Sequence, residues 1–212
     1  MADPTDPAAD AIVRAGAAFE AAGLAPAASG NLSTRSGDHV LLTPTGSRLG
    51  ALDPGALALI GPDGGVVAGP APSKEWPLHL AVYRARLDAR AIVHLHAPAS
   101  VAMSCLATLD PHDAIPPYTA YRVMRIGRLP LVPYIPPGDP ALGEAAAEVA
   151  AGAGRGLLLA NHGLVGWGRD LDEAVAVAEE IEASAALHLR LDGRDVRLLT
   201  DEERAELQRR FG

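Results

Sequence analysis

The sequence contains one cysteine, Cys105, in 212 residues. A single cysteine cannot form an internal disulfide, so the chain is not a disulfide-stapled scaffold. Aromatic residues are also scarce, at 4%, whereas apolar residues as a whole make up 49%. We therefore expect an aliphatic core built from Ala, Val and Leu.

Basic residues are in the minority, with 18 Lys and Arg against 26 Asp and Glu and a net charge of -8. Nucleic acids and anionic membranes bind basic surfaces, so neither partner is expected. No apolar run reaches the roughly 20 residues that span a bilayer, and the first residues lack the basic and apolar regions of a signal peptide. These absences favour a soluble, cytoplasmic protein.

The length and the hydrophobic pattern predict one domain, residues 1–212, with an α/β fold in which helices flank a mixed, largely antiparallel sheet. Helices are expected near residues 6–23, 73–87, 138–151, 171–191 and from 200 onward. Strands are expected at residues 31–35, 39–43, 56–60, 65–68, 129–134 and 156–160, and just before His94. One face of the helix at 73–87 should pack inward, and it carries Trp76, Leu80, Tyr83 and Leu87.

Two histidines, His94 and His96, end the apolar run AIVHLH. Side chains two residues apart in a strand point to the same side, so the two rings would meet at one point while Val93 and Leu95 face the opposite layer. Histidine pairs on strands also occur as hydrogen-bonded core or surface residues. Buried rings need partners, because an unpaired buried polar group costs about 1 to 3 kcal/mol. A metal ion would satisfy both rings.

A third histidine, His162, follows the buried run LLLA. Three protein ligands with one open position are the usual arrangement for catalytic zinc, although imidazole also accepts other divalent metals. Glu75, where a loop enters a helix, could ligate the metal or act as a general base. On spacing alone, Glu75 is more typical of a residue that complements the dipole of its own helix. His79, one turn later, is interpreted as a structural residue rather than a ligand.

Three turns combine small residues with side chains that donate hydrogen bonds, as anion sites do. Gly30 and Asn31 lie in the first, Thr45 and Gly46 in the second, and Ser73 and Lys74 at the start of a helix. Each alone is an ordinary turn. Beside a metal site, the three together predict a phosphorylated or carboxylated substrate.

The whole chain resembles the class II aldolase/adducin family. The resemblance rests on five motifs in the family's order: Ser29-Gly30-Asn31-Leu32-Ser33, Thr43-Pro44-Thr45-Gly46, Pro72-Ser73-Lys74-Glu75, His94-Leu95-His96 and Asn161-His162-Gly163. It implies a three-layer α/β/α fold and a homotetramer with sites at subunit boundaries. It also implies zinc, or another divalent metal, held by His94, His96, His162 and Glu75, with Glu75 also carrying a proton.

The family's phosphate pocket falls on residues of the three turns, namely Gly30, Asn31, Thr45, Gly46 and Ser73. Lys74 stands where fuculose-phosphate aldolase has a second serine, so contacts to the charged groups of the substrate differ there. A tyrosine that protonates the departing aldehyde in the aldolases resembles Tyr121 or Tyr118, and Tyr121 is preferred.

Within the family, the chain looks most like the branch that decarboxylates 3-oxo-tetronate 4-phosphate to dihydroxyacetone phosphate and CO2. Aldol cleavage of a sugar 1-phosphate such as fuculose 1-phosphate is the alternative, because both reactions form the same enediolate. Glu75 argues against the similar ribulose-phosphate epimerases, which carry Asp at this place. Adducin head domains, which are interaction modules, lack the metal residues. A cupin barrel would need a Glu shortly after the histidine pair, and the chain has none there.

Overall fold

The computed structural model describes residues 7–211. Its α-helices are α1 (Pro7–Ala21), α2 (Trp76–Ala85), α3 (Pro98–Ser104), α4 (Pro140–Ala150), α5 (Leu171–Leu191) and α6 (Asp201–Phe211). Its strands are β1 (Asn31–Ser36), β2 (His39–Leu42), β3 (Ala58–Ile60), β4 (Val66–Ala68), β5 (Ala91–Leu95), β6 (Leu131–Val132), β7 (Gly156–Leu159) and β8 (Gly163–Gly168). Short helical turns are η1 (Leu49–Ala51), η2 (Pro54–Ala56) and the π-type turn η3 (Arg122–Ile126).

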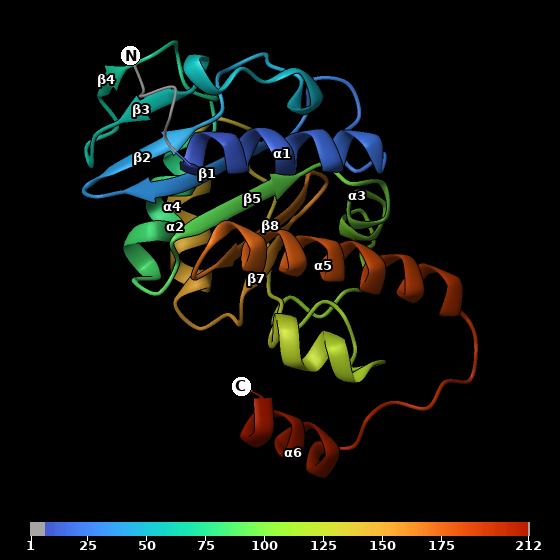
Figure 1. The fold of residues 1–212 in the computed structure, drawn as a ribbon. Coiled ribbons are helices and arrows are strands. Elements are labelled where there is room, and N and C mark those ends of the chain that lie inside the picture. Colours follow the sequence, from blue (N-terminus) through green and yellow to red (C-terminus); the bar gives the residue numbers. More distant parts are fainter. Residues whose placement is uncertain (1–6, 212) are drawn as a thin grey trace.

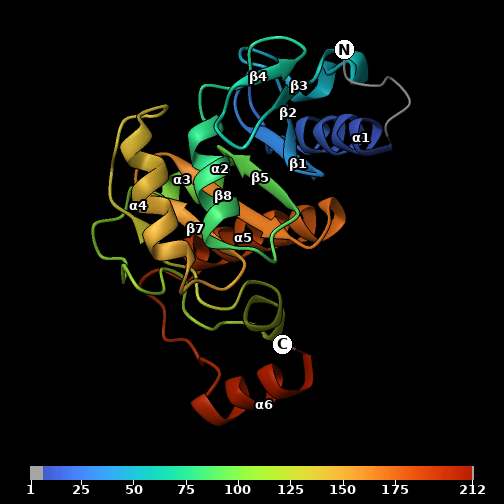
Figure 2. The same ribbon diagram turned by 90° about the vertical axis from the view of Figure 1, so that its left-hand side faces the viewer.

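The strands form one sheet of eight, in the order β4-β3-β2-β1-β5-β8-β7-β6. The β6–β7 pair is parallel, and the other neighbouring strands are antiparallel. Figures 1 and 2 show α2 and α4 on one face of the sheet and α1 and α5 on the other. The expected α/β fold, a largely antiparallel sheet between helical layers, is confirmed.

Alternate residues of β5 enter two separate cores. Val93 and Leu95 belong to the apolar cluster that includes buried residues of α1 and α5, whereas Ile92 belongs to the cluster that includes buried residues of α2 and α4. His94 lies two residues after Ile92, so its side chain enters the layer of α2 and α4. The predicted opposition of Val93 and Leu95 to His94 is therefore confirmed.

Several predicted boundaries are also confirmed by local hydrogen bonds. The β1–β2 hairpin closes with Ser36 opposite His39, and Asp139 caps α4 by accepting a hydrogen bond from the Ala141 amide. Thr200 and Glu203 form a capping box where the last helix was predicted to begin, and each side chain accepts from the other's backbone N–H, at 3.2 and 2.8 Å. The predicted start of the first helix, at residue 6, lies outside the described residues.

Three predictions of local structure were wrong or incomplete. The helix predicted to residue 87 ends at Ala85, so Leu87 follows the helix and is 82% exposed instead of packing inward. The strand predicted at 129–134 is only the two residues of β6. Sequence reasoning also missed β8, which lies between β5 and β7.

Helix α6 stands apart from the sheet at the end of the long segment that follows α5 (Figure 1). It contacts η3 and has no buried residue. No helix within residues 7–211 has the length and apolar character needed to cross a membrane.

Candidate metal centre and adjoining cavity

The two histidines at the end of β5 point to one place. His94 is fully buried, opposite Asn31 of β1 and Val165 of β8, and its Nε2 lies 3.0 Å from Nε2 of His96. Nδ1 of His94 donates a hydrogen bond to the Leu164 carbonyl at 2.8 Å. The Nε2 lone pair of His94 therefore faces the cluster, which is the usual way a ligating histidine is oriented.

His162 reaches the same place from the turn between β7 and β8. The preceding Asn161 has a φ of 54°, a left-handed conformation that asparagine tolerates better than most residues. Because β8 pairs with β5, this turn lies beside the end of β5, and His162 Nε2 is 2.9 Å from His96 Nε2. The predicted convergence of three histidines is present.

Glu75 immediately precedes α2, on the face of the sheet that His94 enters. Its Oε2 lies 3.1 Å from His94 Nε2, and its Oε1 lies 3.1 Å from His162 Nε2. The Asn31 side-chain amide donates to Oε2 at 2.8 Å. Glu75 thus does more than complement its own helix dipole, because its carboxylate is buried and aimed at the three rings.

The four side chains fit a divalent metal ion. Their potential ligand atoms all lie within 4.8 Å of one another, and Glu75 Oε1 is buried without a hydrogen-bond partner among the described residues. Converging imidazole nitrogens and carboxylate oxygens are mainly acceptors, which one shared cation satisfies together.

The protonation states of Glu75 and His96 agree with this fit. Burial would raise the pKa of the Glu75 carboxyl, but the facing His94 and His162 rings lower that pKa well below its usual range. Burial and the neighbouring His94 and His162 rings lower the pKa of His96 to about 4. At neutral pH, Glu75 is a carboxylate and His96 a neutral ring, which are the forms that bind metal.

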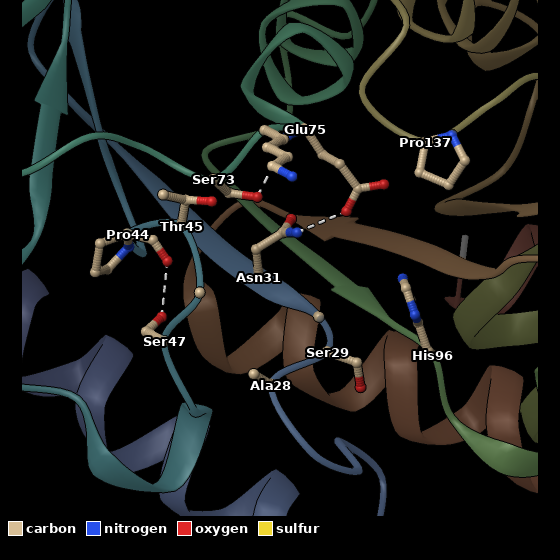
Figure 3. A pocket seen from close by; sticks show the side chains of 13 residues that line it. Ala28, Ser29, Asn31, Pro44, Thr45, Ser47, Ser73, Glu75, His96 and Pro137 are labelled. Atoms are coloured by element: carbon tan, nitrogen blue, oxygen red, sulfur yellow. Dashed lines mark hydrogen bonds between the residues drawn. The ribbon is translucent and has the colours of Figure 1, made fainter.

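A cavity of about 300 Å³ opens beside Glu75 and His96 (Figure 3). All six residues predicted to bind substrate line it: Gly30, Asn31, Thr45, Gly46, Ser73 and Lys74. They come from the start of β1, the loop after β2 and the segment that enters α2. The sheet order therefore brings three distant turns to one hollow beside the histidines.

Gly30 has a backbone requirement in addition to its place in the cavity. Its φ is +81°, and a Cβ at this position would come within 2.9 Å of the His94 carbonyl oxygen. Only glycine lets β1 begin so close to β5. Gly30, which was predicted to belong to an anion site, is thus also required by the packing beside His94.

Lys74 provides the only Lys or Arg side chain among the residues that line the cavity. It makes no ion pair with any residue in the range 7–211. With Glu75 negative at the same cavity, an anionic substrate depends on Lys74 and on a metal ion for positive charge.

Neither tyrosine predicted as a proton donor lines this cavity. Tyr121 is 59% exposed and lies under the Arg125 guanidinium, whose carbon is 5.5 Å from the ring centroid. The Tyr118 hydroxyl is hydrogen-bonded to His188 Nδ1 at 2.8 Å. Within one chain, Tyr121 is therefore not brought to Glu75.

Glu182 of α5 supports the histidine site and was missed by sequence reasoning. It accepts hydrogen bonds from the backbone N–H groups of Ala99 at 2.7 Å and Ser100 at 2.8 Å, and from the Ser100 hydroxyl at 2.6 Å. These donors lie in the first turn of α3, directly after His96, and no local motif signals that a distant glutamate caps them.

Replacing Glu182 with alanine is expected to lower the free energy of unfolding by about 1 to 3 kcal/mol, because it leaves part-buried N–H groups without an acceptor. Urea denaturation of the metal-loaded protein measures this change. Glu179→Ala, at an exposed position of the same helix, serves as the control. Equal losses in the two variants would contradict the capping role.

The fold and the site define an α/β protein in which three histidines and a carboxylate, a group that could hold a metal ion, lie beside a polar cavity. Residues 10–189 match the family model described as class II aldolase and adducin N-terminal domain. The chain belongs to this family.

Similar proteins with known names support the same family assignment. The chain is 43% identical to the 3-oxo-tetronate 4-phosphate decarboxylase of Haemophilus influenzae over 94% of its own length and 95% of the relative. It is 46% identical to the enzyme of that name from Escherichia coli K12, with 93% of each chain covered. It also resembles the crystal structure of YgbL from Escherichia coli, with 44% identity, a TM-score of 0.91 and coverage of 94% and 97%.

A solved structure of L-fuculose 1-phosphate aldolase has the same fold, with a TM-score of 0.87 and 26% identity, covering 98% of this chain and 97% of that one. The chain therefore has relatives of two reaction types. Both types are named for phosphorylated substrates.

Proposed function

We propose that this protein is a metal-dependent lyase that decarboxylates 3-oxo-tetronate 4-phosphate to dihydroxyacetone phosphate and CO2. The observation that carries the proposal is the position of Glu75, whose carboxylate lies at the three histidines and at the cavity formed by the three turns. Relatives 41 to 46% identical that bear this activity in their names support the choice of substrate.

His94, His96, His162 and Glu75 would hold the metal ion, for which zinc is our choice because it binds nitrogen and oxygen ligands of this kind. When bound, the ion supplies positive charge that stabilises the negative charge developing on the substrate oxygens. The buried ring of His94 is already oriented for this role by its bond to Leu164.

The turns that line the cavity would bind the phosphate and the sugar-acid chain. Backbone N–H groups at Gly30 and Gly46, and the side chains of Asn31, Thr45 and Ser73, are the donors. Lys74 adds the one positive charge that the chain itself brings to the cavity. A substrate with a phosphate and a carboxylate requires such donors more than a neutral sugar does.

Glu75 would carry the proton that the substrate gains in the reaction. Loss of CO2 breaks the C1–C2 bond, and the electron pair passes toward C3 to form an enediolate. C2 must then gain a proton to give dihydroxyacetone phosphate. Glu75 is the acidic side chain that lines the cavity, so we assign it to take up a proton and deliver it to C2.

Aldol cleavage is the second candidate function, and it is favoured by the L-fuculose phosphate aldolase of Escherichia coli, which is 36% identical over 89% of this chain and 86% of the relative. That reaction needs a proton donor for the departing aldehyde oxygen. Tyr121 suits this role better than Tyr118, whose hydroxyl is engaged by His188.

We also propose a homotetramer, as the family resemblance implies. Tyr121 is exposed and does not line its own chain's cavity, so we propose that Tyr121 of the partner subunit completes the site. We also propose a cytoplasmic location, in keeping with the single cysteine. Analytical ultracentrifugation of the metal-loaded protein tests the assembly, and a monomer would contradict it.

The function is tested by incubating zinc-loaded protein with 3-oxo-tetronate 4-phosphate and measuring dihydroxyacetone phosphate and CO2. Product above a metal-free control supports the decarboxylase. Release of an aldehyde from fuculose 1-phosphate, without decarboxylation, would instead support the aldolase. No product from either substrate at full metal loading would contradict both.

Replacing Lys74 with serine is expected to raise KM for 3-oxo-tetronate 4-phosphate by about tenfold, because one charge-assisted hydrogen bond is worth roughly 1.5 kcal/mol. Steady-state kinetics with metal content measured in parallel checks this. Arg84→Ser, on the exposed side of α2, is the control for loss of a positive charge. An unchanged KM in the Lys74 variant would contradict a contact with the substrate.

A further inference from the structure

A row of buried polar side chains leads away from Glu75 between β1 and α2. Asn31 and Ser33 are two residues apart on β1, and Glu75, His79 and Tyr83 follow one another at intervals of four along α2. The strand period and the helix period therefore place all five on facing surfaces. Asn31, Ser33, His79 and Tyr83 are at most 3% exposed.

Continuous hydrogen bonds connect these five side chains. Glu75 Oε2 is 2.8 Å from Asn31 Nδ2, and Asn31 Oδ1 is 2.5 Å from His79 Nε2. On the other side of the ring, His79 Nδ1 is 2.7 Å from Ser33 Oγ, which is 2.9 Å from the Tyr83 hydroxyl. The ring of His79 is thus held at both nitrogens.

The direction of each hydrogen bond follows from the carboxylate end. Glu75 can only accept, so the Asn31 amide presents its nitrogen to Glu75 and its oxygen to His79. His79 Nε2 must then carry a hydrogen. Burial, together with His94, lowers the pKa of His79 to about 3, so the ring is neutral and its Nδ1 accepts from the Ser33 hydroxyl.

The remaining donor, the Tyr83 hydroxyl, is within reach of Ser33 Oγ and of the Ser33 carbonyl at 3.1 Å. Every hydrogen in the row can therefore point toward Glu75, and bonds aligned in one direction strengthen one another. The Nε2–H of His79 and the carboxylate of Glu75 require the same orientation of the Asn31 amide, so the ring supports the last bond of the row.

Resting on the function proposed above, we propose that His79 is a positioning residue for Glu75. By fixing the Asn31 amide with its NH2 group toward the carboxylate, His79 holds Oε2 in place and so orients the Glu75 carboxylate. Oε2 accepts from Asn31 at 2.8 Å, and Oε1 faces the histidines, 3.1 Å from His162 Nε2.

The geometry also assigns a role to the second hydrogen of the Asn31 amide. Asn31 lines the cavity beside Glu75, and Figure 3 shows its amide joined to the carboxylate. With the nitrogen turned to Glu75, Asn31 meets the substrate as a donor. A flipped amide would turn its oxygen toward the carboxylate and repel it, so the Glu75 side chain would lose its fixed orientation.

The first test compares His79→Gln with His79→Leu in the zinc-loaded protein. The terminal amide of glutamine can replace the Nε2–H donor to Asn31, whereas leucine fills the space without a donor. We expect the Gln variant to keep kcat within about threefold of wild type. The Leu variant should lose about tenfold in kcat, the scale of one hydrogen bond, with metal content unchanged.

Equal kcat values in the two variants would overturn the positioning role, because a residue that only fills the core responds to volume and not to the donor. If the Leu variant does not fold, Ser33→Ala decides the question. It removes the hydroxyl that holds the ring at Nδ1, so kcat should fall, and an unchanged kcat at full metal content would overturn the proposal.

The second test does not depend on the substrate. In zinc-loaded protein with 15N-labelled histidine, we expect the His79 ring, assigned by its absence in His79→Gln, to carry its hydrogen on Nε2. A hydrogen on Nδ1 would overturn the proposal. Wild-type protein that shows the Nε2–H tautomer but forms no dihydroxyacetone phosphate would contradict the proposed reaction and leave the hydrogen-bond arrangement supported.

Discussion

Replacing Glu75 with glutamine is expected to lower kcat for decarboxylation by about 10²- to 10⁴-fold, the range of contributions made by positioned acids and bases. The carboxamide has nearly the same shape as the carboxylate, but it cannot take up the proton that C2 requires. It also removes a negative charge that faces His94 and His162 at 3.1 Å. The rate of formation of dihydroxyacetone phosphate measures the effect.

The experiment needs two controls. Glu179→Gln, at an exposed position of α5, makes the same chemical change away from the cavity and should keep full activity. Metal content per chain separates loss of the proton carrier from loss of the ion, because His94, His96 and His162 still offer three ligands. A Glu75→Gln variant that turns over within tenfold of wild type would refute the role of the carboxylate.

The histidine part of the site could be predicted from sequence because it depends on local periodicity. His94 and His96 share a side of the chain whenever the segment is extended, and the structure places their Nε2 atoms 3.0 Å apart. Glu75 could not be predicted by the same means. Its position at the histidines depends on how α2 lies across β5, which is a matter of tertiary packing.

Strand β8 was missed for a physical reason that the structure makes clear. Its sequence, GLVGWG, has three glycines, and glycine in a run normally indicates a loop or a weak strand. Here Gly166 and Gly168 make room for α5. A Cβ at Gly166 would lie 3.1 Å from the Val177 side chain, and one at Gly168 would lie 2.6 Å from the Ala174 backbone nitrogen.

The row of polar side chains from Glu75 to Tyr83 depends both on local periodicity and on tertiary packing. The spacings of two on β1 and four on α2 were visible in the sequence, but they become a network only when strand and helix face each other. The same four-residue spacing included Leu87 in the predicted inward face, and that prediction was wrong because α2 ends at Ala85. Periodicity indicates which residues share a face, and packing decides where the face ends.

Replacing His94 with alanine is expected to remove both the metal and the activity. His94 is fully buried, and its Nδ1 hydrogen bond to Leu164 fixes the direction of Nε2, so no neighbouring side chain can substitute for it. Metal analysis of the purified variant should give well under one ion per chain, and thermal unfolding should no longer respond to a chelator as the wild type does.

The control is His112→Ala, an exposed histidine far from the cluster in sequence, which should keep its metal and its response to chelator. The readout is independent of the substrate, so it tests the metal centre even if the proposed reaction is wrong.

Loss of the ring also leaves the Leu164 carbonyl without its donor, at a cost of about 1 to 3 kcal/mol in the free energy of unfolding. Unfolding is therefore compared in metal-free samples of both variants, where this cost appears alone. A His94→Ala protein with a full complement of metal and wild-type turnover would refute the ligand assignment, because the cluster would then be only a hydrogen-bonded group of buried rings.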